Sequence, residues 1–335
     1  MNRKGFNGKA IYNPQGKAGE YSEWACNFYT GCSNNCDYCY CKKGFMGKTW
    51  NEVPQLKKCF TDTQDALVCF VREMEHNIEQ LRQVGVFFTF TSDPMLPETK
   101  QLTWAAIKEA LMREVPVQIL TKRADFLGDP ELEEITPAQR KRVAFGFTLT
   151  GHDELEPGAD TNMMRVAAMV ELHSRGFYTF ASIEPVVDFV ASTSMINLTR
   201  GACDLYKIGC MSGKRYTRQE QIEAFYMLEM LKEDTGSRFY LKESLIKLLN
   251  IDRADLPEHF VEKDFNIFAL AGYQYGVCRV CGCTQHDPCF NPDHGYCGWA
   301  DSSHTLCDFC ADPDLRDSEH TIHCVNTNGY TVSEN

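Results

Sequence analysis

The sequence predicts an α/β fold: a mostly parallel sheet, arranged as a full or partial barrel, with a small C-terminal cysteine-rich metal-binding module. Three observations predict this fold. The 335 residues are 43% hydrophobic and 24% charged, an ordinary globular composition. Strand-like and helix-like segments alternate between residues 24 and 250. Beyond residue 250 the alternation stops, and cysteines gather in a segment that is too short to hold a core without metal.

The alternation begins with an amphipathic segment. Residues 62–83 carry apolar side chains at helical spacing on one face, and the apolar run 86–91 that follows predicts a buried strand. The same reasoning predicts helices over 102–113, 162–174 and 217–233, and strands over 115–121, 142–148, 176–183, 205–209 and 238–241. Strands separated by helices form βα units with parallel strands, and their repetition favours a barrel over two separate sandwiches.

Five segments are expected along the chain. They are an N-terminal arm (1–20), a core barrel (21–250), a linker (251–272), the cysteine-rich module (273–312) and a flexible tail (313–335). The arm is assigned from its turn chemistry, because Asn13-Pro14 and several Gly-Lys or Lys-Gly pairs punctuate it.

The composition also limits the partners. Lys and Arg number 34 against 46 Asp and Glu, so the formal net charge is −12. This charge argues against sequence-independent binding to duplex phosphates, although a local basic groove is compatible with it. No apolar run approaches the roughly 18 residues that span a membrane, and residues 1–20 lack the apolar stretch of a secretory signal. We therefore expect no membrane partner and a cytoplasmic location with reduced thiols.

The 17 cysteines form two main clusters. The first contains Cys32, Cys36 and Cys39, with three and then two residues between them. Three thiolates on one tight loop can hold three irons of a [4Fe-4S] cluster and leave the fourth iron open to a substrate or cofactor. The alternatives are buried free thiols, or a zinc knuckle in which Cys41 or Cys26 supplies the fourth ligand.

The second cluster contains two Cys-x2-Cys pairs, Cys278 with Cys281 and Cys307 with Cys310, separated by 25 residues. This spacing is close to that of a structural zinc site with four cysteine ligands. An auxiliary iron–sulfur cluster is the rival interpretation. The segment has more possible ligands than one tetrahedral site uses, so either a second metal binds or some of the thiols bind no metal. The further cysteines and histidines are Cys283, Cys289, Cys297, His286, His294 and His304.

Polar side chains follow several of the predicted strands at their C-terminal ends. These are Ser92, Asp93, Lys122, Thr148, Thr150 and Glu184. A βα barrel builds its site at that edge, and a cationic Lys together with a carboxylate suits a zwitterionic amino-acid group. Cys210 follows another strand, where it could donate a hydrogen atom to a substrate or serve as a small buried hydrophobe.

The first thiol motif, with Tyr38 directly before Cys39, resembles the signature of radical S-adenosylmethionine (SAM) enzymes. The fuller string, residues 29–41, resembles the branch related to spore photoproduct lyase, and this resemblance extends over about residues 10–245. It implies a partial (β/α)6 TIM-type barrel, with SAM bound to the open iron through its amino and carboxylate groups. It also implies that an electron from the cluster cleaves SAM to a 5′-deoxyadenosyl radical, which abstracts hydrogen from a substrate.

The resemblance further implies roles for single residues. Ser92 and Asp93 stand where the family holds the SAM amino group, in place of the usual Gly-Gly-Glu. Tyr38 is expected to lie against the adenine. Three later positions match a Lys that pairs with the SAM carboxylate, a Ser near the ribose or carboxylate, and an apolar residue that contacts adenine: Lys122, Thr148 and Ile183. Thr91 occupies the position of the lyase's hydrogen-donating Cys, which argues against photoproduct repair.

Two functions from different classes follow. The first is a radical SAM enzyme that receives electrons from a reductant protein such as a flavodoxin or ferredoxin. The branch suggests nucleic acid or a nucleotide as its substrate, with a peptide or a small metabolite nearly as well supported. The second is a non-catalytic iron–sulfur or zinc protein, acting as an electron carrier or a binding module. The second function requires neither an open iron nor a strand-end rim able to hold SAM.

Overall fold

The computed structural model describes residues 5–43, 46–234, 236–271, 278, 280–281, 283–284, 288–300, 306–316 and 321. The chain divides into two compact units, Met1–Ile267 and Phe268–Asn335, called here the barrel unit and the cysteine-rich unit. None of the described helices is both long and apolar enough to cross a membrane.

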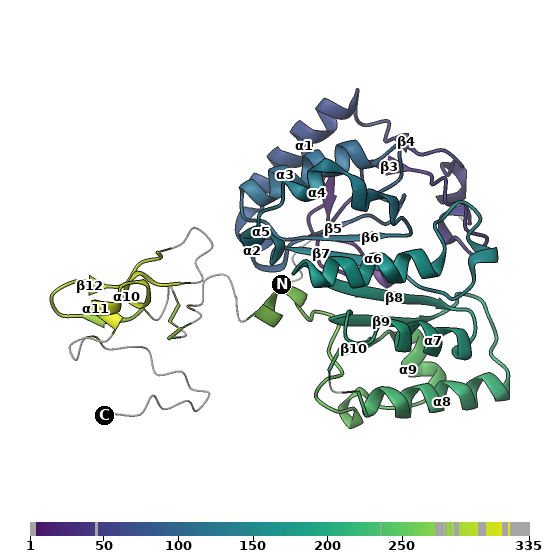
Figure 1. Cartoon of the computed structure of the whole chain (residues 1–335). Helices are drawn as coiled ribbons and strands as arrows, with labels where there is room; N and C mark the ends of the chain where they lie inside the picture. Colours follow the sequence, from purple (N-terminus) through teal and green to yellow (C-terminus); the bar gives the residue numbers. More distant parts are fainter. Residues whose placement is uncertain are drawn as a thin grey trace. The chain divides into compact units, whose positions relative to one another are not determined.

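The barrel unit is built on one eight-stranded sheet (Figure 1). In spatial order its strands are β1 (Ile11–Tyr12), β2 (Ala25–Cys26), β5 (Val86–Phe88), β6 (Val117–Thr121), β7 (Val143–Thr148), β8 (Tyr178–Val186), β9 (Leu205–Cys210) and β10 (Arg238–Leu241). Neighbours from β2 to β10 are parallel, and β1 is antiparallel to β2. Within the described residues β1 and β10 stay at opposite edges, so the barrel is partial. The expected α/β fold is confirmed.

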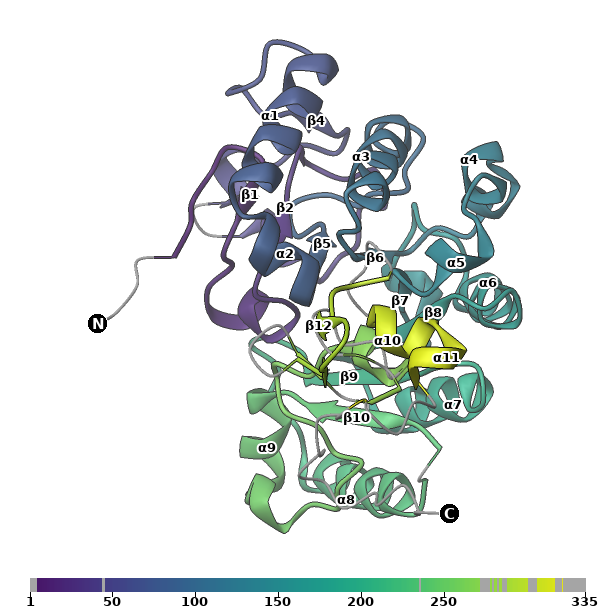
Figure 2. The same ribbon diagram turned by 90° about the vertical axis from the view of Figure 1, so that its left-hand side faces the viewer.

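Helices connect the strands and cover their outer side. They are α1 (Thr63–His76), α2 (Ile78–Val84), α3 (Lys100–Met112), α4 (Pro130–Glu133), α5 (Pro137–Arg140), α6 (Asn162–Ser174), α7 (Phe189–Thr199), α8 (Arg218–Lys232) and α9 (Glu243–Leu249). In Figure 2, α3, α6, α7 and α8 lie outside strands β6 to β10. Side-chain caps begin several of them, because Asp62, Thr161 and Thr217 each accept a backbone N–H three residues later.

The helix α7 was not predicted. Its buried side chains include Phe189, Met195 and Ile196, but Val190 and Leu198 on the same helix are exposed. Apolar residues therefore surround the helix, and the one-faced pattern that identifies an amphipathic helix is blurred.

Part of the expected N-terminal arm belongs to the sheet. Ile11 pairs with Cys26 across β1 and β2. The carboxylate of Glu73 on α1 accepts the backbone N–H groups of Lys9, Ala10 and Ile11 at 2.7, 3.0 and 2.8 Å. A two-residue strand is too short to show a hydrophobic period, so the turn residues dominate the sequence pattern of this segment.

Aromatic side chains fill the interior of the barrel below the site. Phe87 stacks on Phe90 with ring centroids 4.6 Å apart and approaches Phe180 at 6.4 Å. Gly146 on β7 leaves room for this packing, because a Cβ added there would lie 2.1 Å from the Phe180 ring. The filled interior confines any ligand to one end of the sheet.

The remaining elements are short. A second sheet pairs β3 (Tyr29–Thr30) with β4 (Gln55–Leu56), and the thiol loop follows β3 directly. Short 3-10 turns occupy Gly16–Glu20, Tyr40–Lys42, Met46–Lys48, Asp125–Gly128, Asp153–Leu155, Arg253–Asp255 and Ile267–Ala271. The cysteine-rich unit contains β11 (Phe290–Asn291), β12 (Gly295–Tyr296), α10 (Asp308–Ala311) and α11 (Pro313–Arg316). The last of these lies inside the segment expected as a tail, most of which falls outside the described residues.

Candidate functional site

A cavity of about 460 Å³ lies at the carboxyl ends of the parallel strands. Residues at or just after the ends of β5 to β10 contribute to its wall, as does the thiol loop. Because the carboxyl ends of parallel strands meet at one edge, polar residues from distant parts of the sequence converge there. The predicted site residues that line the cavity are Cys32, Cys36, Tyr38, Cys39, Ser92, Asp93, Lys122, Thr148, Glu184 and Cys210.

Two predicted site residues, Thr150 and Ile183, are not among those lining this cavity. Ile183 lies on β8 between Ser182 and Glu184, which do line it. Successive side chains of a strand point to opposite faces, so Ile183 is buried in the core instead. The hydroxyl of Thr150 accepts a hydrogen bond from the backbone of His152 at 3.2 Å. The structure therefore gives no support to their expected contacts with a cofactor.

The backbone around the thiol loop is tightly constrained. Gly31 has a φ of 91° and donates its N–H to Thr91 at 3.1 Å. A Cβ at this position would lie 2.5 Å from the carbonyl oxygen of Asn51, so only glycine fits. Asn35 adopts the left-handed conformation with a φ of 50°, which its short polar side chain tolerates. This turn brings Cys32 and Cys36 to the same cavity wall.

The sulfur atoms of this loop do not form a closed metal site. Throughout the described residues, three or more Cys, His, Asp or Glu ligand atoms within 4.8 Å of one another occur only in the cysteine-rich unit. Cys41 lines the cavity beside Cys39, and Cys26 lies buried in β2, yet neither completes a compact tetrahedron with the loop. The geometry therefore disfavours the zinc-knuckle alternative. An open arrangement fits three thiolates that each bind a different iron.

The thiols of the loop differ in their environments. Burial, together with the nearby Asp93 carboxylate, raises the pKa of Cys32 to about 12. Burial also raises the pKa of Cys36. The hydrogen bond with Cys41 lowers the pKa of Cys39. Cys39 is therefore the thiol of this loop that ionises most readily, and a metal centre would displace the protons of the thiols that remain protonated.

Asp93 ties the thiol loop to the neighbouring strand ends. One carboxylate oxygen accepts the side-chain N–H of Asn34 and the backbone N–H of Lys122, both at 2.7 Å. The other accepts the hydroxyl of Thr121 at 2.6 Å and the backbone N–H of Met95 at 3.0 Å. Both oxygens are thus occupied within the chain. Asp93 acts here as a positioning residue, and its direct contact with a cofactor stays a prediction.

Two cavity residues carry side-chain oxygens that lack a partner. The Ser92 hydroxyl and the Asn34 amide oxygen are buried and accept or donate no hydrogen bond within the described structure. Leaving a buried polar group unsatisfied costs about 1–3 kcal/mol. Both residues line the cavity, but these two oxygens have almost no accessible surface, so a polar ligand would satisfy them once the side chains turn toward it.

A buried network that the sequence did not predict supports Tyr38 and Lys122. The Glu156 carboxylate accepts the hydroxyl of Tyr38 and the guanidinium of Arg165, and the Glu156 and Arg165 side chains are both 0% exposed. The Lys122 ammonium lies 3.8 Å from Glu156 and 5.6 Å from the centre of the Tyr38 ring. Burial raises the pKa of Tyr38, and the neighbouring carboxylate of Glu156 raises it further. Arg165 also donates to the backbone oxygen of Thr148 at 2.5 Å.

One sequence signal could have found this network. Arg165 stands on the buried face of α6 among Val166, Ala168 and Met169. A charged side chain on an apolar helix face requires a buried partner, so its presence predicts a carboxylate nearby.

The wall formed by the ends of β8, β9 and β10 has its own polar cluster. The Lys242 ammonium lies 2.6 Å from a Glu184 oxygen, and the Tyr21 hydroxyl donates to the same oxygen at 2.8 Å. Lys242 also lies 4.1 Å from the centre of the Tyr21 ring. Glu184 is therefore held by residues of the chain. Cys210 lines the same wall, and burial raises its pKa to about 11, so it is a neutral thiol at neutral pH.

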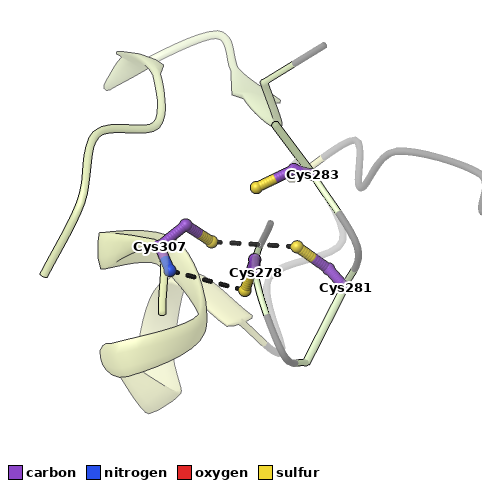
Figure 3. Close-up of side chains that lie close together, drawn as sticks. All are labelled: Cys278, Cys281, Cys283 and Cys307. Carbon is purple, nitrogen blue, oxygen red and sulfur yellow. Dashed lines mark hydrogen bonds between the residues drawn. The ribbon is translucent and has the colours of Figure 1, made fainter. Parts of the chain in front are cut away.

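The cysteine-rich unit gathers most of its described thiols into two overlapping groups, the first of which is drawn in Figure 3. One group contains Cys278, Cys281, Cys283 and Cys307, and the other contains Cys283, Cys289, Cys297 and Cys307. Cys310 was predicted as a ligand, but it falls outside both groups, although it is buried and interacts with Cys281 and Cys307. Of the three histidines, His294 is exposed, and His286 and His304 lie outside the described residues.

Comparisons with known proteins return solved structures only. No protein-family model and no curated protein matches the chain. A spore photoproduct lyase variant with bound AdoMet and dinucleoside spore photoproduct has a TM-score of 0.45 and 16% identity, over 64% of this chain and 62% of that one. Streptococcus suis SuiB bound to S-adenosylmethionine has a TM-score of 0.44 and 12% identity, over 75% of this chain and 56% of that one. This chain thus spans less than two thirds of either structure.

Proposed function

We propose that this protein is a radical SAM enzyme, with a [4Fe-4S] cluster on Cys32, Cys36 and Cys39 and with SAM in the adjoining cavity. One observation carries the proposal: three thiols of a single loop face a cavity at the carboxyl ends of parallel strands, and among the described residues no fourth ligand atom closes them into a compact site. When bound, the cluster and SAM supply reductive cleavage of a carbon–sulfur bond and a carbon radical able to take hydrogen from a substrate.

The chain offers suitable partners for each end of SAM. Ser92 and Asn34 have buried oxygens without a partner, which suit an ammonium group. This assignment differs from the sequence prediction, since Asp93 is occupied by its own contacts. Lys122 is a buried cation on the wall and suits a carboxylate. Tyr38 presents its ring beside that Lys, where an adenine could stack on it.

The opposite wall is assigned to the substrate. It carries the thiol of Cys210, which remains protonated at neutral pH and so retains the S–H bond that a hydrogen donor needs. The ammonium of Lys242 and the hydroxyl of Tyr21 on the same side both bind the carboxylate of Glu184, so they shape this wall and are not free partners for a substrate. A nucleotide or a nucleic acid is proposed as the substrate from the branch that the thiol motif resembles. Electrons would come from a flavodoxin or ferredoxin, in the reducing cytoplasm that an open iron requires.

The test is product formation by the whole chain. The protein is reconstituted anaerobically with iron and sulfide, reduced, and incubated with SAM, and 5′-deoxyadenosine is measured by mass spectrometry. We expect the product from the parent protein and its loss in Cys36→Ala. Cys59→Ala is the matched control, because Cys59 is exposed and is not among the residues lining the cavity. A loaded cluster that yields no 5′-deoxyadenosine would refute the proposal and favour the non-catalytic alternative.

A further inference from the structure

The two thiol groups of the cysteine-rich unit share two members. Cys283 and Cys307 belong to both groups, while the other four thiols belong to one group each. Two separate tetrahedral sites would need eight thiolates. Six thiolates are enough for two ions when two of the ligands are shared.

The sulfur separations identify the kind of centre. Within the first group the sulfur atoms of Cys281 and Cys307 are 3.8 Å apart, and within the second those of Cys283 and Cys297 are 3.6 Å apart (Figure 3 shows the first pair). The sulfur atoms of Cys281 and Cys289, which belong to different groups, are 3.4 Å apart and would have to separate when two ions bind. A tetrahedral ion with metal–sulfur bonds of about 2.3 Å sets its thiolates about 3.8 Å apart. In an iron–sulfur cube each thiolate binds a different iron, which spreads the cysteine sulfurs further. The separations within each group therefore match a tetrahedral ion.

Three separate pieces of chain converge on this centre. The segment 278–283 is closed by a hydrogen bond from the Cys278 N–H to the Cys283 carbonyl at 2.8 Å. The hairpin of β11 and β12 is closed by a bond from the Cys297 N–H to the Cys289 carbonyl at 2.9 Å. Cys307 directly precedes α10. Each piece is too short to bury a core alone, so bound metal supplies the cross-links that hold them together.

Backbone N–H groups are directed at sulfur atoms of both groups. The N–H of Cys289 donates to the sulfur of Cys297 at 3.1 Å, and the N–H of Cys307 donates to that of Cys278 at 3.4 Å. Such hydrogen bonds stabilise the negative charge of a thiolate and orient it toward a metal. One is found in each group, as expected if both groups hold an ion.

We infer that the cysteine-rich unit holds two zinc-type ions in one six-thiolate centre, with Cys283 and Cys307 bridging both ions. Cys278 and Cys281 complete one tetrahedron, and Cys289 and Cys297 complete the other. Two dications with six thiolates carry a net charge of −2, lower than that of two separate four-thiolate sites. Cys310 is a buried neighbour of the centre and not a ligand. This centre is independent of the reaction proposed for the barrel unit.

The stoichiometry is tested on the full chain with Cys32, Cys36 and Cys39 replaced by Ala, so that the barrel loop contributes no metal. Zinc, iron and sulfide per chain are measured by elemental analysis and native mass spectrometry. We expect two zinc ions and no inorganic sulfide. A single zinc ion would refute the bridged centre, and iron with sulfide would identify an auxiliary cluster instead.

The bridges are tested by cobalt(II) titration of the same protein. With shared thiolates, the electron paramagnetic resonance signal grows with the first equivalent and declines with the second, because bridging sulfur couples the two ions magnetically. Two uncoupled signals would overturn the bridging assignment even if two ions bind. Cys283→Ala should lower the zinc content below two, whereas Cys310→Ala, the matched control, should retain two zinc ions. If Cys283→Ala fails to fold, the cobalt titration of the parent protein still distinguishes bridged ions from separate ones.

Discussion

The buried carboxylate of Glu156 gives the most demanding test of the barrel unit. It accepts hydrogen bonds from Tyr38 and Arg165, and it lies 3.8 Å from Lys122. In Glu156→Gln one of the two oxygens becomes an amino group, so only one acceptor remains for the two donors. The positive charge of Arg165, 0% exposed, then loses its counter-ion. Breaking a buried pair in this way costs about 3–5 kcal/mol.

The assay is urea unfolding of the parent and variant proteins, prepared with equal metal content. Glu79→Gln is the control, because Glu79 is exposed in the first turn of α2 and should leave the stability unchanged. Adding Arg165→Met to Glu156→Gln should recover part of the loss, since the uncompensated charge is then absent. A loss below about 1 kcal/mol for Glu156→Gln, or strictly additive losses in the double variant, would refute the reasoning, because either result means that the pair is solvated or uncoupled.

Three further predictions follow from single positions. Ser92→Ala should weaken SAM binding in equilibrium dialysis, and an unaltered SAM affinity would contradict this prediction. The same variant should leave the free energy of unfolding unchanged or slightly raised, because the buried hydroxyl has no hydrogen-bond partner among the described residues. Gly146→Ala should cost about 1–3 kcal/mol in urea unfolding, because its Cβ would meet the Phe180 ring at 2.1 Å, whereas Gly128→Ala, with nothing within 4 Å, should be nearly neutral. Burial lowers the pKa of Lys207 to about 7, so the unfolded chain binds more protons than the folded one between that pH and the ordinary Lys value. The stability of the parent relative to Lys207→Met should therefore rise between pH 7 and pH 9.5, by at most about 1.4 kcal/mol per pH unit, and a flat difference would contradict the shift.

The sequence predicted those site residues that stand at the ends of strands, because the parallel arrangement of the strands is enough to bring them together. Ser92, Lys122, Thr148 and Cys210 each follow a recognisable strand, and the carboxyl ends of parallel strands necessarily meet. Ile183 shows where this reasoning stops. A strand end can be recognised from the sequence, but a shift of one residue decides whether a side chain faces the cavity or the core.

Contacts between distant residues left no local pattern. Tyr38 and Glu156 are 118 residues apart, and Tyr21 and Glu184 are 163 residues apart. The same limit applies to the choice among the seven described thiols of the cysteine-rich unit. Spacing favoured the Cys307–Cys310 pair, whereas the fold brings the sulfur of Cys283 within 4.8 Å of those of Cys278 and Cys307. A ligand set is decided by distances in space, which spacing along the chain restricts but does not determine.

In the assignment proposed above, the two groups of thiols take different metals because of their spacing and not because of their ligand type. Both use cysteine, so the intrinsic affinities of the sulfur atoms are similar. On the barrel loop no compact group forms, and a tetrahedral ion would have to pull the constrained backbone at Gly31 and Asn35 out of its turn. In the cysteine-rich unit the sulfurs are already at tetrahedral distances, so a cube would have to push them apart. With the metals proposed above, each group of thiols therefore disfavours the metal of the other, which would let one chain load an open iron site and a closed structural site without exchange between them.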